Sequence, residues 1–340
     1  MTPRAGLRAL LLLALAAYAA PAQDRAAPPR DGRAFRLLTW NVSDSAWVQH
    51  LDETRAVLRH ADADVFAFEQ VAPGMDAGAV RRILSGLRGP ADTTWFVSVR
   101  PADPAVEHTV IASRDPIREI PEFALVEVAD TGRLATLGAW PDSARFRGIY
   151  ATRAATRSNA ASVRVRGAWV LVTAVHLTCC GSPGDWREFR RQAEAAAIRK
   201  RLDEVAARVR PDAVVVAGDM NLVSGRAAMD TVLGSLRRSS LGPMRRADAL
   251  HFDGWTDWTW DGRGTPFNGG RLDNVIYSAG ALAPGHARIW DTEWLPTDTL
   301  RAHGLEAATS QTIGRHRPVV VDFSLARRAR GVARAHRGAN

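Results

Sequence analysis

The sequence is poor in cysteine: it contains only Cys179 and Cys180, which are adjacent. Two thiols exclude a metal site built from four thiolates. Neighbouring residues of an extended chain do not reach the geometry of a relaxed disulfide, so a bond between them needs a strained turn. Gly181 and Pro183 supply turn-forming residues for one. The sequence leaves open a vicinal disulfide, two free thiols and a disulfide to another chain.

Long apolar runs are also missing after the N-terminal segment. The longest later stretch without a charge, residues 167–184, is interrupted by His176 and by a Gly/Pro turn. It therefore predicts a strand followed by a loop, not a membrane span, which needs about 20 apolar residues.

The N-terminal segment has the composition of an export signal. Arg4 and Arg8 precede an apolar run over residues 9–20, and an Ala-Pro-Ala tripeptide ends at Ala22. A basic start, a short apolar run and an A-x-A site are typical of a secretory signal peptide. We expect cleavage after Ala22, which removes residues 1–22 and places the mature protein outside the cytoplasm, periplasmic or secreted. An uncleaved membrane anchor is the alternative.

Neither a Gly/Ser/Pro-rich linker nor an internal repeat divides the remaining sequence. The full sequence has 46% hydrophobic residues, with 11 Trp, which is sufficient for one large core. We expect a flexible segment over residues 23–33, one domain over residues 34–325 and a basic, disordered tail over residues 326–340. The sequence does not indicate an obligate protein partner, so we expect a monomer.

The positive charge is concentrated at the two ends. The formal net charge is +9, but the expected signal peptide carries two arginines and residues 327–340 carry five without an acid. The body of the protein is therefore close to neutral, at about +2. This balance does not demand a broad basic groove for nucleic acid. The tail is either a contact for phosphates or anionic lipid headgroups, or a solvated terminus.

Short apolar runs separated by helical or loop-like segments predict an α/β protein. The expected strands are residues 35–41, 64–70, 94–100, 108–113, 169–176, 213–218, 273–278 and 317–323. The clearest helix is 185–209, where Asp185 is placed to cap the first turn, and residues 52–60 and 76–87 are also predicted to be helical. Mixed strands with helices between them predict two sheets packed face to face, with helices covering both outer sides.

The most informative motif follows the apolar strand 212–217, where the sequence continues as Gly-Asp-Met-Asn. Residues two apart in an extended chain point to the same side. Asp219 and Asn221 are therefore expected together at the open end of a sheet, where functional groups often gather. A carboxylate beside an amide holds a hard cation, positions a water or binds a phosphoryl oxygen. An ordinary turn is the alternative.

Other polar groups lie beside the ends of expected strands, and a Ser-Arg-x-Pro-Ile turn occupies residues 113–117. In chain order, these polar residues are Asn41, Glu69, Gln70, His176, Asp273 and His316. With the Gly-Asp-x-Asn motif, the series resembles the endonuclease/exonuclease/phosphatase superfamily, whose members include DNase I-like nucleases, abasic-site endonucleases, bacterial sphingomyelinases and inositol-polyphosphate phosphatases. The resemblance covers residues 34–325. It implies a four-layer α/β sandwich: two mixed or antiparallel sheets packed face to face, with helices on both outer sides.

The resemblance also implies catalytic roles for five residues. His316 would contact the scissile phosphate or act in acid–base catalysis, and Asp273 would orient its imidazole. Asp219 would orient or deprotonate the nucleophilic water, and Asn221 would support the pentavalent phosphorus. His176 would be a second histidine facing the phosphate. A surface histidine, for His316, and a core histidine, for His176, are the alternatives.

A site for Mg²⁺ or Mn²⁺ is implied as well, with Asn41 near the metal and the phosphate. The family pattern puts a metal-binding glutamate six positions after Asp64, and Gln70 occupies that position here. Adjacent strand residues point to opposite faces, so Glu69 replaces Gln70 only if the strand bulges by one residue. The carbonyl oxygen of Gln70 is a weaker ligand than a carboxylate.

Two substrate-binding residues are expected beside this cluster. Arg315 stands where the family pattern has an aspartate, and its guanidinium either binds a phosphate oxygen or points to solvent. Trp260 ends a segment, residues 255–260, that contains three Trp. We expect Trp260 to border the substrate, stacking on a base or inserting into a lipid interface. A loop folded onto its own aromatic rings is the alternative.

The leading hypothesis is an exported, divalent-metal-assisted phosphodiesterase of nuclease or phospholipase type that uses an activated water. Its substrate would be nucleic acid, a phospholipid headgroup or a small phosphorylated molecule. Gln70 and Arg315 keep two alternatives open. One is a non-catalytic phosphate-binding relative with a degenerate metal site. The other is a metal-independent phosphoesterase that uses Arg315 with His176 and His316.

Overall fold

The computed structural model describes residues 34–100, 107–128, 155–223 and 225–326. The expected signal peptide, the segment 23–33 and all but the first residue of the expected tail lie outside these ranges. They therefore stay predictions. Within the described residues, no helix is both long enough and apolar enough to cross a membrane.

Two six-stranded sheets form the centre of the protein. The first has the order β11 (Leu282–Ile289), β12 (Val319–Leu325), β1 (Ala34–Asp44), β2 (Val65–Val71), β4 (His108–Ser113), β3 (Phe96–Arg100). The second has the order β5 (Ile117–Glu119), β6 (Arg157–Val165), β7 (Ala168–His176), β8 (Ala213–Asp219), β10 (Asp273–Ser278), β9 (Met244–Arg246). One pair in each sheet is parallel, β1 with β2 and β7 with β8, and the other neighbours are antiparallel.

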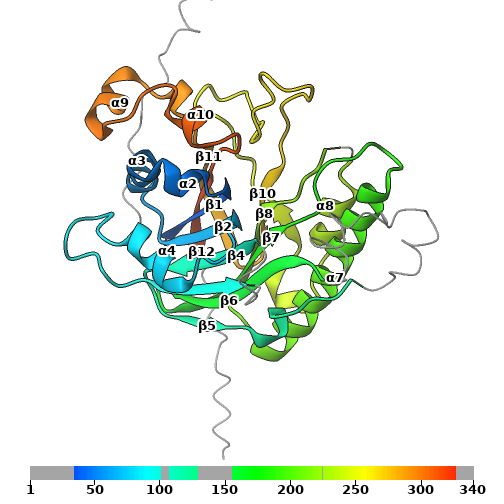
Figure 1. Ribbon diagram of the computed structural model, residues 1–340. Coiled ribbons are helices and arrows are strands. Elements are labelled where there is room, and N and C mark those ends of the chain that lie inside the picture. The colour runs from blue at the N-terminus through cyan, green and yellow to red at the C-terminus, as the bar shows by residue number, and fades with distance from the viewer. Residues whose placement is uncertain (1–33, 101–106, 129–154, 224, 327–340) are drawn as a thin grey trace, which may run out of the picture.

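Alternate side chains of the central strands separate an inner core from two outer cores. Along β1, Phe35 and Leu37 pack between the sheets, whereas Leu38 and Trp40 pack against helices. Each such fully buried side chain contributes about 1.5–3 kcal/mol relative to its exposed state. Figure 1 shows α2, α3 and α4 on one side of the sheets and α7 and α8 on the other. The expected sandwich of two sheets between helices is confirmed.

The helices and short 3-10 turns complete the fold. The helices are α2 (Ala46–Gln49), α3 (Leu51–Ala61), α4 (Ala77–Leu84), α7 (Trp186–Val209), α8 (Ala227–Leu233), α9 (Thr297–His303) and α10 (Thr309–Ile313). The 3-10 turns are η1 (Pro121–Phe123), η3 (Ser239–Leu241) and η4 (Thr292–Trp294). The prediction for α7 is confirmed, since the Asp185 side chain accepts a hydrogen bond from the backbone N–H of Arg187.

Two long strands, β6 and β11, were missing from the expected set. The first half of β6 is polar, and its buried Asn159 is satisfied by donating to the Ser98 and Thr109 carbonyls of the other sheet. β11 is an edge strand that contains Pro284 and Gly285, residues that disfavour strands, and its register shifts there. Both strands depend on their partners and not on a local apolar pattern.

The sheets bring chemically active side chains to one edge because strand ends meet there. Asp219 ends β8 and lies in register with His176 on one side and with Asp273 on the other. Gly218 makes this contact possible: its φ is +139°, and a Cβ there would lie 2.0 Å from the Val175 carbonyl oxygen.

Candidate active site

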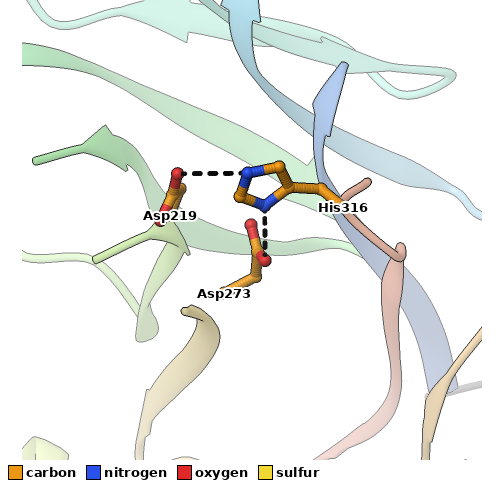
Figure 2. A group of neighbouring side chains, drawn as sticks. All are labelled: Asp219, Asp273 and His316. Carbon is orange, nitrogen blue, oxygen red and sulfur yellow. Dashed lines mark hydrogen bonds and ion pairs between the residues drawn. The ribbon is translucent and has the colours of Figure 1, made fainter. Parts of the chain in front are cut away.

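The centre of the site is a histidine between two carboxylates. The Nδ1 of His316, just before β12, is 2.9 Å from Oδ2 of Asp273, and its Nε2 is 3.9 Å from Oδ2 of Asp219 (Figure 2). The three side chains are buried, and one ligand atom of each lies within 4.8 Å of the others. Asp219 and Asp273 lie at the ends of paired strands of one sheet and His316 precedes β12 of the other, so only the packing of the two sheets brings all three together.

The backbone of His316 is held from both faces. Its carbonyl oxygen accepts a hydrogen bond from the indole N–H of Trp40 at 3.1 Å. The next residue, Arg317, is completely buried and donates to Asp291 at 2.7 Å and to Asp261 at 3.1 Å. Removing one partner of such a buried pair is costly, about 3–5 kcal/mol, so this network holds the segment firmly.

Three donors surround the carboxylate of Asp219. The amide of Asn41 donates to it at 2.9 Å, and Asn221 donates from its backbone N–H at 2.9 Å and from its side chain at 3.0 Å. Burial and the charge of Asp273 raise the pKa of Asp219 to about 6, although His316 and these donors oppose the rise. Asp219 is thus a carboxylate of increased basicity.

The side-chain amide of Asn221 has no hydrogen left for a substrate. One goes to Asp219 and the other to the Leu177 carbonyl at 2.9 Å. These contacts make Asn221 a residue that positions Asp219. Its expected role in supporting the pentavalent phosphorus stays a prediction.

His176 lies on the other side of Asp219. Its Nε2 is 3.7 Å from Oδ2 of Asp219, and its Nδ1 is 3.8 Å from Oε2 of Glu107. Glu107 itself accepts a hydrogen bond from Arg157 at 2.9 Å. Burial, with the positive charges of Arg157 and His316, holds the pKa of His176 well below its ordinary value. At neutral pH, His176 is an uncharged imidazole.

The positively charged form is favoured at the other histidine. Burial alone lowers the pKa of His316, but the carboxylates of Asp273 and Asp219 outweigh burial and raise the pKa above its ordinary value. The two imidazoles are thus pushed apart in pKa. This is the division expected of groups with different proton roles.

A β-bulge at the pair Glu69–Gln70 separates the two residues, because it takes Gln70 out of the regular alternation of β2. Phe68 pairs with Val110, but Val71 pairs with His108, so β2 gains an extra residue between them. Glu69 lies beside Asn41 and is completely buried, whereas Gln70 adopts a left-handed φ of +53° and is only partly buried.

The structure therefore corrects the expected position of Gln70. Glu69 shares the inner face of β2 with Val65 and Ala67, since the three residues are two apart in the strand. The count of six from Asp64 did not use this alternation, because Asp64 lies before the strand begins. The Glu69 carboxylate accepts a hydrogen bond from Thr39 at 2.8 Å. Burial, then the charges of Asp273 and Asp219, raise its pKa well above the ordinary value.

The cluster has the character of a site for a hard divalent cation. Glu69, Asp219 and Asp273 are three buried carboxylates in mutual electrostatic contact. Oε2 of Glu69 and Oδ1 of Asp273 are buried and have no hydrogen-bond partner within the described part of the chain. Buried carboxylate oxygens without donors are costly unless a cation compensates them. The residues present thus fit Mg²⁺ or Mn²⁺.

The two expected substrate-binding residues have different placements. Arg315 is exposed and donates to the carbonyls of Asp261 and Arg263 at 3.1 and 2.8 Å, so it lies outside the buried cluster. This contact does not support a phosphate clamp. Trp260 is half-buried, and its backbone pairs with that of His316, so Trp260 does border the cluster. The first ring of the segment, Trp255, is 85% exposed.

Four residues around the cluster were not identified in the sequence: Thr39, Glu107, Arg157 and Arg317. Thr39 lies two positions before Asn41, so strand alternation could have revealed it. Arg157 is opposite His176 only because β6 pairs with β7. No local pattern marks Glu107 or Arg317, whose roles come from contacts distant in sequence.

These pKa shifts predict how pH changes the stability of the metal-free protein. For Asp219 and Glu69 the pKa in the folded protein is above the pKa in the unfolded chain. Their contribution to stability is therefore present at low pH and is lost as the pH rises, for Asp219 through about pH 6. His316 acts in the same direction, because its raised pKa favours folding until pH passes that value. The lowered pKa of His176 has the opposite effect: its contribution to stability is lost as the pH falls below the ordinary histidine pKa.

In EDTA, we therefore expect the unfolding temperature to fall between about pH 5 and about pH 7.5 more steeply in the wild type than in Asp219→Asn. Mn²⁺ should reverse the fall at the higher pH, because ligands must be deprotonated to bind metal. Thermal unfolding at both pH values measures this. Parallel profiles of the two proteins would contradict the shift assigned to Asp219.

The fold and the cluster together define a class: an α/β sandwich with an acidic, histidine-containing site at one edge of its sheets. The model of the Endonuclease/Exonuclease/phosphatase family matches residues 38–310. The chain belongs to this family, whose enzymes are usually hydrolytic phosphoesterases that depend on divalent metal. No curated protein matches the chain.

Solved structures with the same fold are distant in sequence. Truncated TDP2 from Caenorhabditis elegans is 12% identical with a TM-score of 0.55, covering 86% of this chain and 99% of that chain. An endonuclease/exonuclease/phosphatase from Beutenbergia cavernae is 19% identical with a TM-score of 0.55, covering 86% and 72%. The human Nocturnin catalytic domain with bound sulfate is 14% identical with a TM-score of 0.51, covering 86% and 94%. At these identities the likeness shows the fold.

Proposed function

We propose that this protein is a divalent-metal-assisted phosphodiesterase that uses water as the nucleophile. The observation that carries the proposal is the buried pair His316–Asp273, which faces Asp219. A carboxylate oxygen of Glu69 without a hydrogen-bond partner in the described chain, and membership of a family of phosphoesterases, support it. An acid, a base and a cation site next to each other are the parts that hydrolysis at phosphorus needs.

Glu69 and Asn41 would hold the cation, with the free oxygen of Asp273 nearby in the same cluster. The Oδ1 of Asn41 accepts a hydrogen bond from the backbone of Ser43 and keeps a second lone pair. When bound, the cation would polarise a phosphoryl oxygen. All the proposed ligand atoms are oxygens, which hard cations prefer, so we propose Mg²⁺ or Mn²⁺.

The remaining residues divide the proton transfers. Asp219, whose pKa is raised to about 6, is ionised at neutral pH and basic enough to orient water and accept its proton. His316, held at Nδ1 by Asp273, would present its Nε2 to a phosphoryl oxygen or the leaving group, and its raised pKa favours the protonated form that donates there. The uncharged His176 donates or accepts one hydrogen bond beside the phosphate without adding charge.

The substrate class follows from charge. The body of the chain is close to neutral, so long-range attraction of a nucleic-acid duplex is weak. A diester carries one negative charge, which one divalent cation and one imidazolium compensate, and three buried carboxylates disfavour further anionic groups. We propose phosphodiesters, in single-stranded nucleic acid, phospholipid headgroups or small molecules, over monoesters.

Release of p-nitrophenol from bis-p-nitrophenyl phosphate tests the activity. We expect turnover with Mg²⁺ or Mn²⁺, its loss in EDTA, and slower turnover of p-nitrophenyl phosphate, a monoester. His316→Ala purified in parallel controls for contaminating hydrolases. Turnover that persists in EDTA would support metal-independent chemistry. Inorganic phosphate binding without turnover in any divalent metal would make the chain a non-catalytic relative.

We further propose that the enzyme works outside the cytoplasm after cleavage behind Ala22. The basic, apolar and A-x-A regions of the first 22 residues support this. The mass of the protein recovered from periplasm or medium should correspond to a chain that starts at Gln23. An intact N-terminus in the membrane fraction would contradict cleavage.

A further inference from the structure

The two cysteines lie in the connection between β7 and α7, beginning three residues after His176. Cys179 is partly buried and Cys180 is exposed. Cys180 has a φ of +69°, which is unusual for this residue type, and Gly181 follows with +91°. A Cβ at Gly181 would lie 3.0 Å from Cβ of Arg187, so the turn packs closely on the start of α7.

Side chains of α7 hold this turn in place. Glu194 accepts hydrogen bonds from the backbone N–H of Thr178 at 2.7 Å and from its hydroxyl at 2.9 Å. Arg191 donates to the carbonyls of Thr178 at 2.6 Å and of Cys180 at 3.2 Å. The two adjacent thiols are thus carried by a backbone that α7 holds in place.

The charges around the turn make the two thiols unequal. The hydrogen bond from Cys179 lowers the pKa of Cys180 to about 6, and Arg187 and Arg191 lower it further, against burial and the charge of Asp219. The same hydrogen bond and burial raise the pKa of Cys179. One exposed thiolate beside one retained thiol is the pairing that thiol–disulfide exchange uses.

We propose that Cys179 and Cys180 form a redox-active dithiol that exchanges with small-molecule disulfides and closes to a vicinal disulfide. The Cys180 thiolate attacks one sulfur of the disulfide R–S–S–R, forms a mixed disulfide and releases RS⁻. The Cys179 sulfur, losing its proton to solvent or to RS⁻, then attacks the Cys180 sulfur and expels the second RS⁻. The balance is one dithiol and one disulfide giving one vicinal disulfide and two R–SH.

The product is a reducible bond and not a structural one. Neighbouring Cα atoms are about 3.8 Å apart across a trans peptide, shorter than the 4.4–6.8 Å usual for disulfides. The resulting strain makes the bond more oxidising than a structural disulfide, so thiols reopen it. The pair therefore cycles between two states.

Ring closure acts next to the active site. The Leu177 carbonyl, two residues before Cys179, accepts hydrogen bonds from Asn221 at 2.9 Å and from Arg157 at 3.1 Å. Closing the ring changes the backbone that carries this carbonyl, and Asn221 positions Asp219. The closed state is thus the slower hydrolase, an effect that rests on the proposed function, whereas ring formation itself does not.

The test treats the reduced, full-length protein with oxidised glutathione and measures intact and peptide masses. The wild type should lose two hydrogen atoms, with no lasting adduct, and recover them with dithiothreitol. Cys179→Ser should stop at a stable glutathione adduct on Cys180, and Cys180→Ser should react more slowly because Cys179 is partly buried. A lasting adduct, a disulfide-linked dimer or two unreacted thiols in the wild type would overturn the dithiol.

Diester hydrolysis by the same samples tests the effect on the active site. The ring-closed wild type should lose activity that dithiothreitol restores, and Cys180→Ser, which cannot close the ring, should lose less activity in the same time. Equal activity of the open and closed forms would overturn the link to the site. If no form hydrolyses diesters, the proposed function fails, while the mass measurement still decides the dithiol.

Discussion

His316→Ala should lower phosphodiester hydrolysis by at least about a hundredfold, because a positioned acid–base group contributes about 10²–10⁴-fold. His316 is buried, its Nδ1 is hydrogen-bonded to Asp273, and its Nε2 is directed toward Asp219. We therefore expect that no neighbouring side chain within the described residues replaces it when it is removed. The measurement is kcat with bis-p-nitrophenyl phosphate at saturating Mg²⁺. His286→Ala, an exposed histidine of β11, is the matched control and should keep wild-type activity.

The partner variant Asp273→Asn separates a catalytic pair from two independent residues. If Asp273 acts through His316, the double variant should be no slower than His316→Ala alone. The single change should also lower the pKa of His316, because Asp273 is the main group that raises it, and so shift the pH profile. Additive losses, with folding confirmed by circular dichroism, would mean that the two residues do not work as a unit.

Glu69→Gln should weaken divalent-metal binding by more than about tenfold, since losing even an indirect partner of a metal site costs about 10–100-fold. The carboxylate is completely buried, and its Oε2 has no hydrogen-bond partner in the described chain. Two titrations with Mn²⁺ measure the effect: the rise in unfolding temperature and the recovery of activity after EDTA. Without metal, the variant should unfold at a higher temperature, because an uncompensated buried carboxylate is gone.

Gln70→Glu is the matched control one residue away. Gln70 is only partly buried at the bulge, so a carboxylate there should leave metal affinity nearly unchanged. Tighter metal binding by Gln70→Glu, with no effect of Glu69→Gln, would return the ligand to position 70. The two variants therefore have opposite expected results under the two assignments.

Much of the site could be predicted from the sequence because its parts lie in local patterns. Apolar runs locate most central strands, and polar residues at their ends mark Asn41, Asp219, Asp273 and His316. These positions depend on the alternation and length of strands, which are local properties of the chain. The long helix α7 and its cap at Asp185 are local in the same sense.

The tertiary structure decided what depends on distant partners. Alternation along β2 puts Glu69 on the inner face with Val65 and Ala67, but the bulge that takes Gln70 out of this alternation arises between β2 and β4, whose residues are about 40 positions apart. Arg315 turns away from the cluster because carbonyls more than 50 residues earlier accept its hydrogen bonds. A side chain's contacts are set by the nearest partners in space, and only packing of the two sheets brings those partners close.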